Sequence, residues 1–594
     1  MDYRACPNLV RMLFDQAERL GDKPCLWTKR DGAWRAVSYR DVGAQTSQLA
    51  RTLRALGVQP GDRVGLVAEN RPEWVIADFA IMAAGGVCVP AYVTNTIEDH
   101  RYVLANTGCK GVIASTQALA EKALLAARQV QGCGFMIAIE PPRGAGGTMV
   151  VQSWYDALAR GLREADGIEA AVAGLGRGDL ACIIHTSGTG VQPKGETLHH
   201  GAILTNCLGA YHLLEQLGLG DEVFLSFLPL SHSYEHSAGE CFPLSIGAQI
   251  YFAESVEALS SNLVEVRPTI MTAVPRLYET LHRRIVSGVE RQGGLKAALF
   301  HKGLAVGRKR YEAPSSLSLL ERLVDPLLDR LVRDKVRARF GGRLKALVSG
   351  GAPLNYEIGL FFTALGLTLL QGYGQTEAAP VVSANPPGRV KLDTVGPPLV
   401  DVQVKVAEDG EILVHGELVM QGYWNDPEAT QATVRDGWLH TGDVGLIDGD
   451  GYIKITDRKK DFIKNSGGNM IAPARVEGLL ALQPEILQAM VHGDLRPHLV
   501  AVIVPHPDMA KAWTQAHGEA GNPSGLADDK AFRAAIEKAV ERVNAQLSAA
   551  ERIRRFVVAR EPFTIANEMM TPTLKIRRHK VREAYGAALE KLYQ

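Results

Sequence analysis

The stretch "HTSGTGVQPKGETLHH" runs from His185 to His200 and surrounds one lysine, Lys194, with glycines and hydroxyl side chains. Glycine backbones can approach an anion closely and turn their N–H groups toward it, while hydroxyls and an ammonium group add donors and positive charge. This composition predicts a phosphate-binding loop, and the alternative is a surface loop without a ligand. The apolar run before the loop and "GETLHH" after it predict the order strand, loop, strand.

Spacing excludes two well-known phosphate loops. The Walker pattern G-x-x-x-x-G-K-[ST], counted from Gly188, meets Pro193 in place of its second glycine and Gly195 in place of its hydroxyl. A dinucleotide fingerprint G-x-G-x-x-G, counted from the same glycine, again meets Pro193 in place of its third glycine. The ligand of this loop therefore has to be inferred together with other segments.

Composition limits the class of protein. The chain has 594 residues, with 65 basic and 65 acidic side chains, so no global charge favours a nucleic acid partner. Its eight cysteines form no C-x-x-C pair, which indicates a reducing cytosol rather than disulfides or zinc. The first residues, "MDYRACPNLVRML", contain an early acid and no apolar stretch, so we expect no secretory signal. The longest apolar run, 79–93, contains a proline and is shorter than the about 20 residues of a membrane span, so we expect a soluble or peripheral protein.

Hydrophobic patterns predict the fold class. Up to about residue 250, strand-like runs such as "RVGLVAEN" alternate with helical patterns such as "DVGAQTSQLARTLRALG", which indicates α/β layering. Residues 141–180 resemble a loop-rich connector between two lobes. Short strands and turns after Asp401 predict a β-rich subdomain, and a compact α/β unit follows. We therefore expect an α/β protein with a large multi-lobed N-terminal domain and a small C-terminal α+β domain.

Residues 276–345 differ from the rest in charge. They contain 17 basic and 7 acidic side chains in a chain that is neutral overall. The apolar positions recur at spacings of three and four and predict an amphipathic basic helix despite Pro326; they are Leu320, Leu323, Val324, Leu327, Leu328, Leu331 and Val332. One interpretation is a solvated basic face, and the other is contact with anionic lipid headgroups or substrate phosphates.

Three further segments carry side chains suited to a nucleotide. The glycines of "VSGGAPL" (348–354) permit close backbone approach to a flat ligand. In "LLQGYGQTEAAP" (369–380), Tyr373 can stack on a base, and Thr376 with Glu377 can supply oxygen ligands to Mg²⁺. In "DGWLHTGDVG" (436–445), the carboxylate of Asp443 follows a glycine turn and can accept hydrogen bonds from a ribose diol, although an Asx turn is the alternative.

Two segments near the C-terminus complete the set. A basic connection and a glycine pair lie in "DRKKDFIKNSGGNMIAPARVE" (457–477), and "TPTLKIRR" (571–578) carries Lys575 in a proline-flanked loop. With these segments the chain resembles the ANL group of adenylate-forming enzymes, and within it the long-chain fatty-acid–CoA ligases. The resemblance runs from "PNLVRMLFDQAERLGDKPCL" and "GVQPGDRVGLVAENRPEWV" to "TPTLKIRR", and "LPLSHSYEH" (228–236) and "VPRLYETL" (274–281) resemble the long-chain subgroup.

The resemblance implies a domain plan and a set of site residues. It implies an AMP-binding domain over residues 1–457, a hinge over 458–460 centred on Lys460, and a mobile domain over 461–594 that carries Lys575. The implied catalytic residues are Lys575, Glu377, Thr186 and Lys194, with Mg²⁺ held by Glu377 and by Thr186 or Thr376. The implied ATP and AMP contacts are Thr186, Ser187, Gly188, Thr189, Lys194, Gly350, Gly351, Ala352, Pro353, Tyr373, Gly374, Thr376, Asp443 and Arg458, and the implied coenzyme A loop is Gly467 and Gly468.

The implied activity is ATP-dependent activation of a long-chain fatty acid to acyl-AMP, followed by thioester formation with coenzyme A. We expect Mg²⁺ as the only metal, no nucleic acid partner, and a cytoplasmic protein that contacts an anionic membrane peripherally if at all. His232 and His236 either line the acyl pocket or pack in the core. Two other functions remain open: an acyl-AMP ligase that loads a carrier protein, and a non-catalytic nucleotide- or acyl-binding relative. The retention of Glu377 and Lys575 argues against the second.

Overall fold

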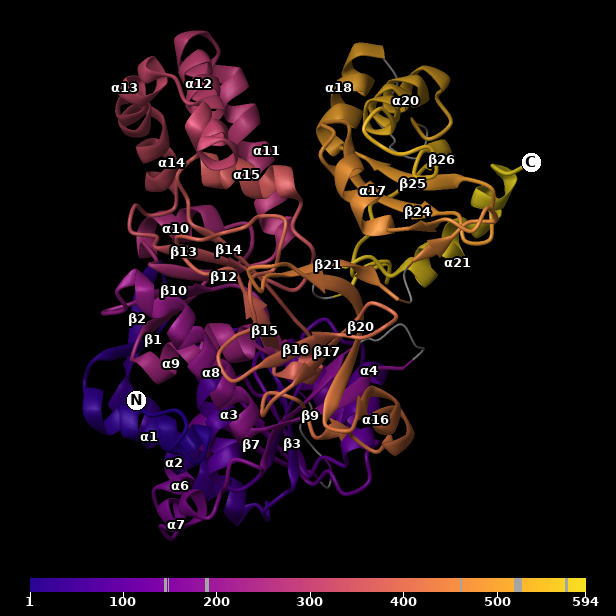
Figure 1. Cartoon of the computed structure of the whole chain (residues 1–594). Helices are drawn as coiled ribbons and strands as arrows, with labels where there is room; N and C mark the ends of the chain where they lie inside the picture. Colours follow the sequence, from indigo (N-terminus) through magenta and orange to yellow (C-terminus); the bar gives the residue numbers. More distant parts are fainter. Residues whose placement is uncertain (144–146, 148, 187–191, 460–461, 518–525, 572–574) are drawn as a thin grey trace.

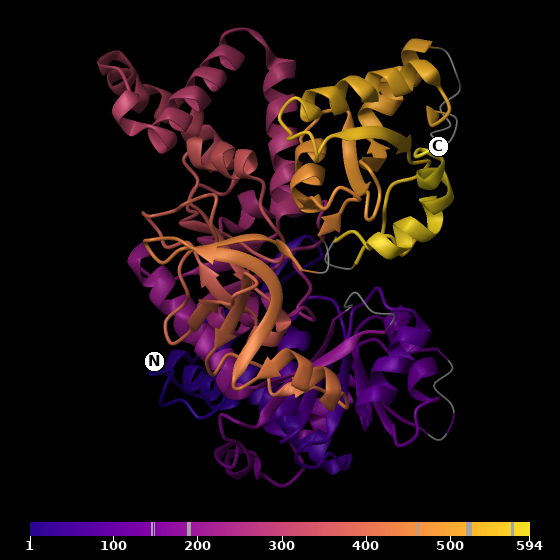
Figure 2. The same cartoon turned by 45° about the vertical axis from the view of Figure 1, so that its right-hand side comes forward.

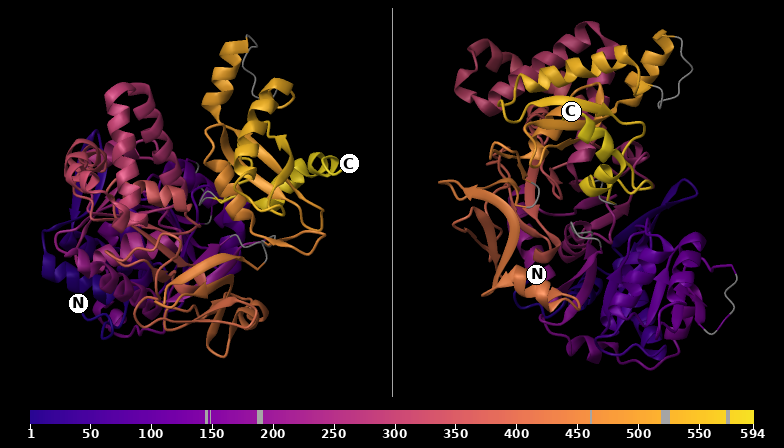
Figure 3. Two further views of the ribbon diagram at one scale, coloured as in Figure 1. Left: turned by 45° about the horizontal axis from the view of Figure 1, so that its top comes forward. Right: turned by 90° about the vertical axis from the view of Figure 1, so that its right-hand side faces the viewer.

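The computed structural model describes the chain except residues 144–146, 148, 187–191, 460–461, 518–525 and 572–574. It shows a large domain that includes the N-terminus and a small domain that includes the C-terminus (Figures 1 and 3). Within the described residues, no helix is long and apolar enough to cross a membrane.

The first eight-stranded sheet has the strand order β18-β9-β8-β4-β3-β5-β6-β7. Its core strands are parallel, and β8 and β9 form an antiparallel pair at one side. The strands are β3 (Arg63–Val67), β4 (Val87–Pro90), β5 (Gly111–Ala114), β6 (Phe135–Ala138), β7 (Val150–Ser153), β8 (Leu180–Thr186), β9 (Lys194–His199) and β18 (Gly422–Tyr423). Its helices are α1 (Leu9–Leu20), α2 (Tyr39–Ala55), α3 (Pro72–Ala83), α4 (Ile97–Thr107), α5 (Gln117–Ala127), α6 (Trp154–Gly161), α7 (Ile168–Ala173) and α8 (His200–Leu214), followed by η1 (Glu215–Leu217).

Side-chain alternation along these strands gives the sheet two buried faces. In β5, Ile113 contributes to the core that includes α2, α3 and α6, whereas Val112 and Ala114 contribute to a separate core with α4 and α5. Successive strand residues point to opposite faces, so helices cover both sides. Hydroxyl caps begin several of these helices, as when Thr96 and Asp99 form a reciprocal capping box at α4.

The second eight-stranded sheet has the order β15-β14-β13-β12-β10-β11-β1-β2, and its inner strands are parallel. Its strands are β1 (Pro24–Arg30), β2 (Ala33–Ser38), β10 (Val223–Ser226), β11 (Gln249–Phe252), β12 (Ile270–Ala273), β13 (Ala346–Ser349), β14 (Leu369–Gly374) and β15 (Val381–Ala384). The helical elements with it are η2 (Glu235–Cys241, a π-helix), α9 (Phe242–Ile246), α10 (Leu259–Val266), α15 (Tyr356–Ala364) and η5 (Thr376–Ala378). One hydrophobic core is continuous between the two large sheets.

A β-rich subdomain and a helical projection complete the large domain. The subdomain contains β16 (Gln403–Val406), β17 (Glu411–His415), β19 (Val434–Arg435), β20 (Trp438–Ile447) and β21 (Ile453–Arg458), with α16 (Pro427–Thr433). The projection contains α11 (Pro275–Gln292), α12 (Gly294–Glu312), η3 (Pro314–Ser316), α13 (Leu319–Leu328), η4 (Asp329–Arg333) and α14 (Asp334–Arg339). Figure 2 shows the projection at the same end of the large domain as the small domain.

The small domain is built around the sheet β24-β25-β26. Its elements are β22 (Ile463–Lys464), β23 (Met470–Ile471), α17 (Pro473–Ala481), β24 (Ile486–His492), β25 (Leu499–Pro505), α18 (Pro507–His517), α20 (Lys530–Asn544), β26 (Ile553–Val558) and α21 (Arg578–Lys591). Two hydrophobic clusters of its own lie on this sheet. A hydrogen bond from Arg276 Nη1 to the Leu487 carbonyl (3.2 Å) links it to α11.

The fold confirms the expected α/β class, the β-rich subdomain and the small C-terminal α+β domain. The expectation of a loop-rich connector over 141–180 was wrong in part. That segment contains β7, which extends the first sheet, and α6, which packs on α2. The glycines and prolines of the segment indicated loops, but the fully buried side chain of Trp154 anchors α6. All eight cysteines are free and buried, as the absence of paired spacing indicated.

Candidate active site

The predicted phosphate loop connects two paired strands. β8 and β9 are antiparallel, and Thr186 lies opposite Lys194 where they end. The order strand, loop, strand is therefore confirmed, and it differs from the strand-to-helix turns of Walker and dinucleotide loops. Ser187, Gly188 and Thr189 lie outside the described residues, so the structure places only the two ends of the loop.

Two carboxylates lie beside the start of this loop. Thr186 Oγ1 donates a hydrogen bond of 2.6 Å to Glu196 Oε1, and Tyr423 Oη donates one of 2.8 Å to Glu377 Oε1. Glu196 is buried, and its Oε2 has no hydrogen-bond partner within the described residues. Burial, and then the negative charge of Glu377, raise the pKa of Glu196 well above its ordinary value. Two neighbouring carboxylates and a hydroxyl are hard oxygen donors of the kind that Mg²⁺ selects.

Lys194 and Thr376 each contact other side chains of the protein. The Nζ atom of Lys194 lies 3.5 Å from Asp426 Oδ2 and 4.6 Å from the centre of the Tyr423 ring. The hydroxyl of Thr376 is buried and lies 2.9 Å from Ser233 Oγ. Of the two threonines suggested as partners of Glu377, Thr186 is thus the one hydrogen-bonded to a neighbouring carboxylate.

A second polar group joins β14 to β20 and β21. Tyr373 Oη donates a 2.6 Å hydrogen bond to Asp443 Oδ2, and Arg458 Nε donates one of 2.9 Å to Asp443 Oδ1. Asp443 is buried within the long strand β20, so its expected place in a turn was wrong. Gly442 has a φ of 71°, which bends the strand locally without ending it. The carboxylate is therefore held in place by two donors.

The predicted glycine positions lie where two parallel strands end. Gly350 follows β13, and a Cβ there would come within 2.9 Å of the Tyr234 ring. Gly351, which precedes Ala352 and Pro353, has a φ of 81°. Gly374 ends β14, where a Cβ would lie 1.8 Å from the Pro380 carbonyl oxygen. The backbone therefore requires glycine at these points, at the carboxyl edge where parallel sheets bind ligands.

Lys575 reaches this edge from the small domain. Lys575 as a whole residue is exposed to solvent, whereas its amino group lies among protein atoms that desolvate it. This desolvation, and then the positive charge of Arg458, lower the pKa of Lys575 to about 8, while Asp443 and Glu377 act in the opposite direction. Burial and the positive charge of Lys575 lower the pKa of His232 to about 3. Lys575 of the small domain is thus close enough to Arg458, Asp443 and Glu377 of the large domain for their charges to influence its pKa.

The predicted coenzyme A loop lies elsewhere on the small domain. Gly467 and Gly468 connect β22 to β23 and are exposed, and Gly468 has a φ of 81°. The loop is held from within, because the Asn465 N–H donates to the Asn469 carbonyl and the Asn469 N–H donates to Asn465 Oδ1. Lys460 lies outside the described residues.

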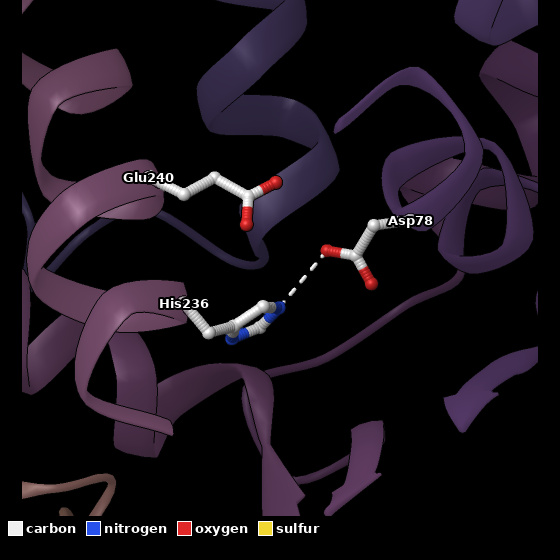
Figure 4. Close-up of side chains that lie close together, drawn as sticks. All are labelled: Asp78, His236 and Glu240. Carbon is white, nitrogen blue, oxygen red and sulfur yellow. Dashed lines mark hydrogen bonds and ion pairs between the residues drawn. The ribbon is translucent and has the colours of Figure 1, made fainter. Parts of the chain in front are cut away.

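His236 belongs to a buried cluster in the core, which favours the packing alternative. Its Nε2 lies 3.0 Å from Asp78 Oδ2, and Glu240 points toward both residues (Figure 4). One possible ligand atom from each residue lies within 4.8 Å of the others, a spacing that a metal ion could bridge. Burial, and then the negative charge of Asp78, raise the pKa of Glu240 well above its ordinary value. We interpret the cluster as a neutral acid beside a His–Asp pair that joins α3 to η2.

This interpretation predicts that Glu240→Gln stabilises the protein increasingly as pH rises. A carboxyl whose pKa is raised in the folded state contributes stability below its unfolded pKa of about 4.3 and loses it as pH increases. Glutamine does not titrate, so the variant does not lose stability in this way. The Tm difference between the variant and the parent protein should therefore grow between pH 5 and pH 8. Glu235→Gln is the matched control: its folded pKa is about 7, so its gain should level off near that pH. A pH-independent difference for Glu240→Gln would show that Glu240 is ionised in the fold.

Sequence reasoning missed Glu196, Tyr423 and Ser233. Glu196 stands in "GETLHH", where a carboxylate within a strand between Gly195 and Thr197 was a visible signal of a polar site. Tyr423 comes from β18, far along the chain, and reaches Glu377 only because β18 pairs with β9. No local pattern predicts that pairing.

The large domain with its three sheets and the small domain that carries Lys575 correspond to the two models of one enzyme family. The model of the AMP-binding enzyme family matches residues 13–424, and that of the AMP-binding enzyme C-terminal domain matches residues 460–594. The chain belongs to the AMP-binding enzyme family.

Relatives and solved structures agree with this family. The chain is 33% identical to the long-chain-fatty-acid–CoA ligase FadD15 of Mycobacterium tuberculosis, over 99% of this chain and 97% of that protein. It is 30% identical to human long-chain-fatty-acid–CoA ligase 6, over 99% and 88%. The adenylation domain of a carboxylate reductase from Mycobacterium chelonae has a similar fold, with a TM-score of 0.78 at 23% identity over 99% and 91% of the two chains. The anthranilate CoA ligase AuaEII in complex with anthranoyl-AMP gives 0.74 at 22% identity over 99% of each chain.

Proposed function

We propose that this protein is a long-chain fatty-acid–CoA ligase. It joins a fatty acid to ATP, giving acyl-AMP and pyrophosphate, and then transfers the acyl group to the thiol of coenzyme A, releasing AMP. The observation that carries the proposal is the buried Asp443 carboxylate, held by hydrogen bonds from Tyr373 and Arg458, with Lys575 of the small domain near enough to be affected by its charge. Full-length similarity to long-chain ligases supports the choice of acid.

In the first step, this chain's side chains bind the reactants and stabilise charge. Lys575 donates to the fatty-acid carboxylate and to the α-phosphate, where negative charge gathers as the acid attacks. Lys194 and the 186–194 loop bind the phosphates that leave. Asp443 accepts hydrogen bonds from the ribose hydroxyls while Arg458 and Tyr373 hold it in place. Gly350 to Pro353, Gly374 and Tyr373 border the adenine.

The oxygen donors beside the loop fit Mg²⁺. Glu377, Glu196 and Thr186 offer carboxylate and hydroxyl oxygens, and Glu196 Oε2 is buried with no other partner in the described chain. A bound Mg²⁺ would neutralise charge on the phosphates. The hydrogen bond from Thr186 to Glu196 holds the Thr186 hydroxyl oxygen beside the loop.

The second step requires a different position of the small domain. We infer a hinge at 458–460, about which residues 461–594 rotate so that Lys575 leaves the site and the Gly467–Gly468 loop approaches the pantetheine arm of coenzyme A. One site then serves both half-reactions in turn. Thioester formation needs the acyl-AMP carbonyl and the thiol to be aligned, and AMP departs as the thioester bond forms.

An acid panel tests the proposal. We expect palmitate and oleate to give faster coenzyme-A-dependent AMP release than acetate or benzoate. A preference for acetate or an aryl acid would overturn the long-chain assignment. Acyl transfer to a carrier protein, with none to coenzyme A, would make the protein a carrier-loading ligase. The absence of fatty-acid-dependent pyrophosphate release would leave a non-catalytic relative.

Glu196→Gln should weaken the use of Mg²⁺ more than the binding of ATP alone. Glutamine preserves the shape of the side chain and its contact with Thr186, but it cannot ionise as the Glu196 carboxyl would on binding Mg²⁺. We expect the concentration of Mg²⁺ for half-maximal adenylation to rise about tenfold, since a lost charge–charge contact costs about 1.4 kcal/mol or more. Mn²⁺ binding followed by electron paramagnetic resonance gives a readout independent of turnover, and Glu417→Gln, a carboxylate paired with Arg177, is the control. Unchanged Mn²⁺ affinity would remove Glu196 from the metal site.

A further inference from the structure

The helix α13 presents leucines to solvent on the helical projection. Leu319, Leu320 and Leu323 are 79%, 71% and 77% exposed, and Leu327 and Leu331 continue the row. In a folded domain the apolar face of a surface helix ordinarily packs on the core. The amphipathic helix predicted from sequence is therefore present, but only Leu328 and Val332 of its predicted stripe are buried.

The acidic side chains of this segment face the protein instead. Glu321 pairs with Lys309 at 2.8 Å, and Asp325 pairs with Arg310 and with the fully buried Arg333. Asp329 pairs with Arg337. The carboxylates are thus neutralised by neighbouring helices, and the helix is turned so that its leucines point away from the projection.

The exposed side also carries unpaired positive charge. Arg322 and Arg330 lie among the leucines in the sequence and are exposed, and no ion pair joins either of them to another side chain within the described chain. Residues 276–345 as a whole hold 17 basic and 7 acidic side chains. Exposed leucines together with unpaired arginines are complementary to a lipid membrane with an apolar interior and anionic headgroups.

We propose that α13 docks this protein on the surface of an anionic lipid membrane, with Leu319, Leu320, Leu323 and Leu327 entering the acyl boundary and Arg322 and Arg330 contacting the headgroups. Insertion of apolar side chains and attraction of basic side chains to anionic headgroups act together in reversible membrane binding, because neither interaction alone holds a protein firmly. In Figure 1, α13 lies on the side of the projection away from the small domain, so docking there leaves the small domain uncovered. If the proposed ligase function is correct, docking brings the enzyme to a lipid phase in which long-chain acids are dissolved.

Vesicle sedimentation tests the proposal without any turnover, so its failure is distinguishable from failure of the ligase function. The full chain is mixed with vesicles of phosphatidylcholine with or without phosphatidylglycerol. We expect binding that requires phosphatidylglycerol and weakens near 1 M salt, where the Debye length is about 3 Å. The triple variant Leu320→Ser, Leu323→Ser, Leu327→Ser should bind at least about tenfold more weakly, because buried leucines drive insertion.

Matched controls separate this face from general hydrophobicity. The triple variant Leu125→Ser, Leu162→Ser, Leu495→Ser removes exposed leucines from other surfaces and should bind vesicles like the parent protein. Equal loss in both triple variants, or no binding by the parent protein, would overturn the proposal. Self-association of the parent protein that the α13 variant abolishes, without vesicle binding, would instead identify a second copy of the chain as the occupant and overturn it as well.

A labelled cysteine locates the contact directly. All eight native cysteines are buried, so a cysteine at Leu323 can be labelled selectively with an environment-sensitive dye. Its emission should shift to the blue on anionic vesicles. The same dye at Leu495→Cys, on the exposed turn between β24 and β25, should not respond. A shift at Leu495 with none at Leu323 would place the membrane contact on the small domain and overturn the role of α13.

Discussion

Lys575→Ala is expected to lower the rate of acyl-AMP formation by about 10²–10³-fold while thioester formation from supplied acyl-AMP stays close to normal. The reason is that a charge aimed at the developing transition state is lost, and such losses cost about this much in rate. In the present arrangement of the domains, Lys575 is close enough to Asp443, Arg458 and Glu377 for their charges to affect its pKa, and we propose that it moves away from them in the second step. The two half-reactions are measured separately on one preparation.

The pH dependence of the first half-reaction gives an independent check. The pKa of Lys575 is lowered to about 8, so the charged form falls away as pH rises through that value. We expect kcat/KM for adenylation to decline above about pH 8, because that parameter reports groups of the free enzyme. Lys575→Arg keeps its charge to higher pH and should move the decline upward. Normal adenylation by Lys575→Ala at any pH would contradict the assigned role.

Local patterns in the sequence predicted much of this fold, for physical reasons. The period of apolar residues in 41–57 predicted a helix, which is observed as α2, and the strand-like run at 63–70 predicted a strand, which is observed as β3. Each of these signals depends on neighbours in sequence. The strands on either side of the 186–194 loop were predictable for the same reason, because one strand-like segment precedes the glycines and another follows them.

Contacts between distant segments could not be predicted in this way. The orientation of α13 is one example, because the helical period shows an apolar face but not the ion pairs with α12 and η4 that hold the opposite face against the protein. The place of Asp443 is another: a glycine turn was visible, but the pairing that continues β20 through it depends on Glu411 and Arg458 from other strands. Tertiary contacts override the local preference at both positions.

The boundary between the two domains lies within a few residues. The backbone N–H of Lys459 donates to the Gly442 carbonyl at 2.8 Å, and its Nζ contacts Asp409 and Glu411, so Lys459 belongs to the β-rich subdomain. Ile463 is buried in the hydrophobic cluster of the small domain. A rotation of one domain against the other must therefore use backbone torsions between these two residues, which supports the proposal of a hinge at Lys460.

Lys460→Pro should abolish most of the overall ligation while preserving one half-reaction. Proline fixes φ near −65° and removes one N–H, which restricts the backbone change that rotation requires and leaves every proposed ligand-contacting side chain in place. We expect acyl-AMP formation to survive, since Lys575 is already near enough to charged groups of the large domain for them to affect its pKa. Lys460→Ala is the control, because it removes the same side chain without restricting φ, and it should retain both steps. Equal loss of both half-reactions in Lys460→Pro would indicate misfolding or a binding defect, and full activity in both would show that the chain turns at another residue.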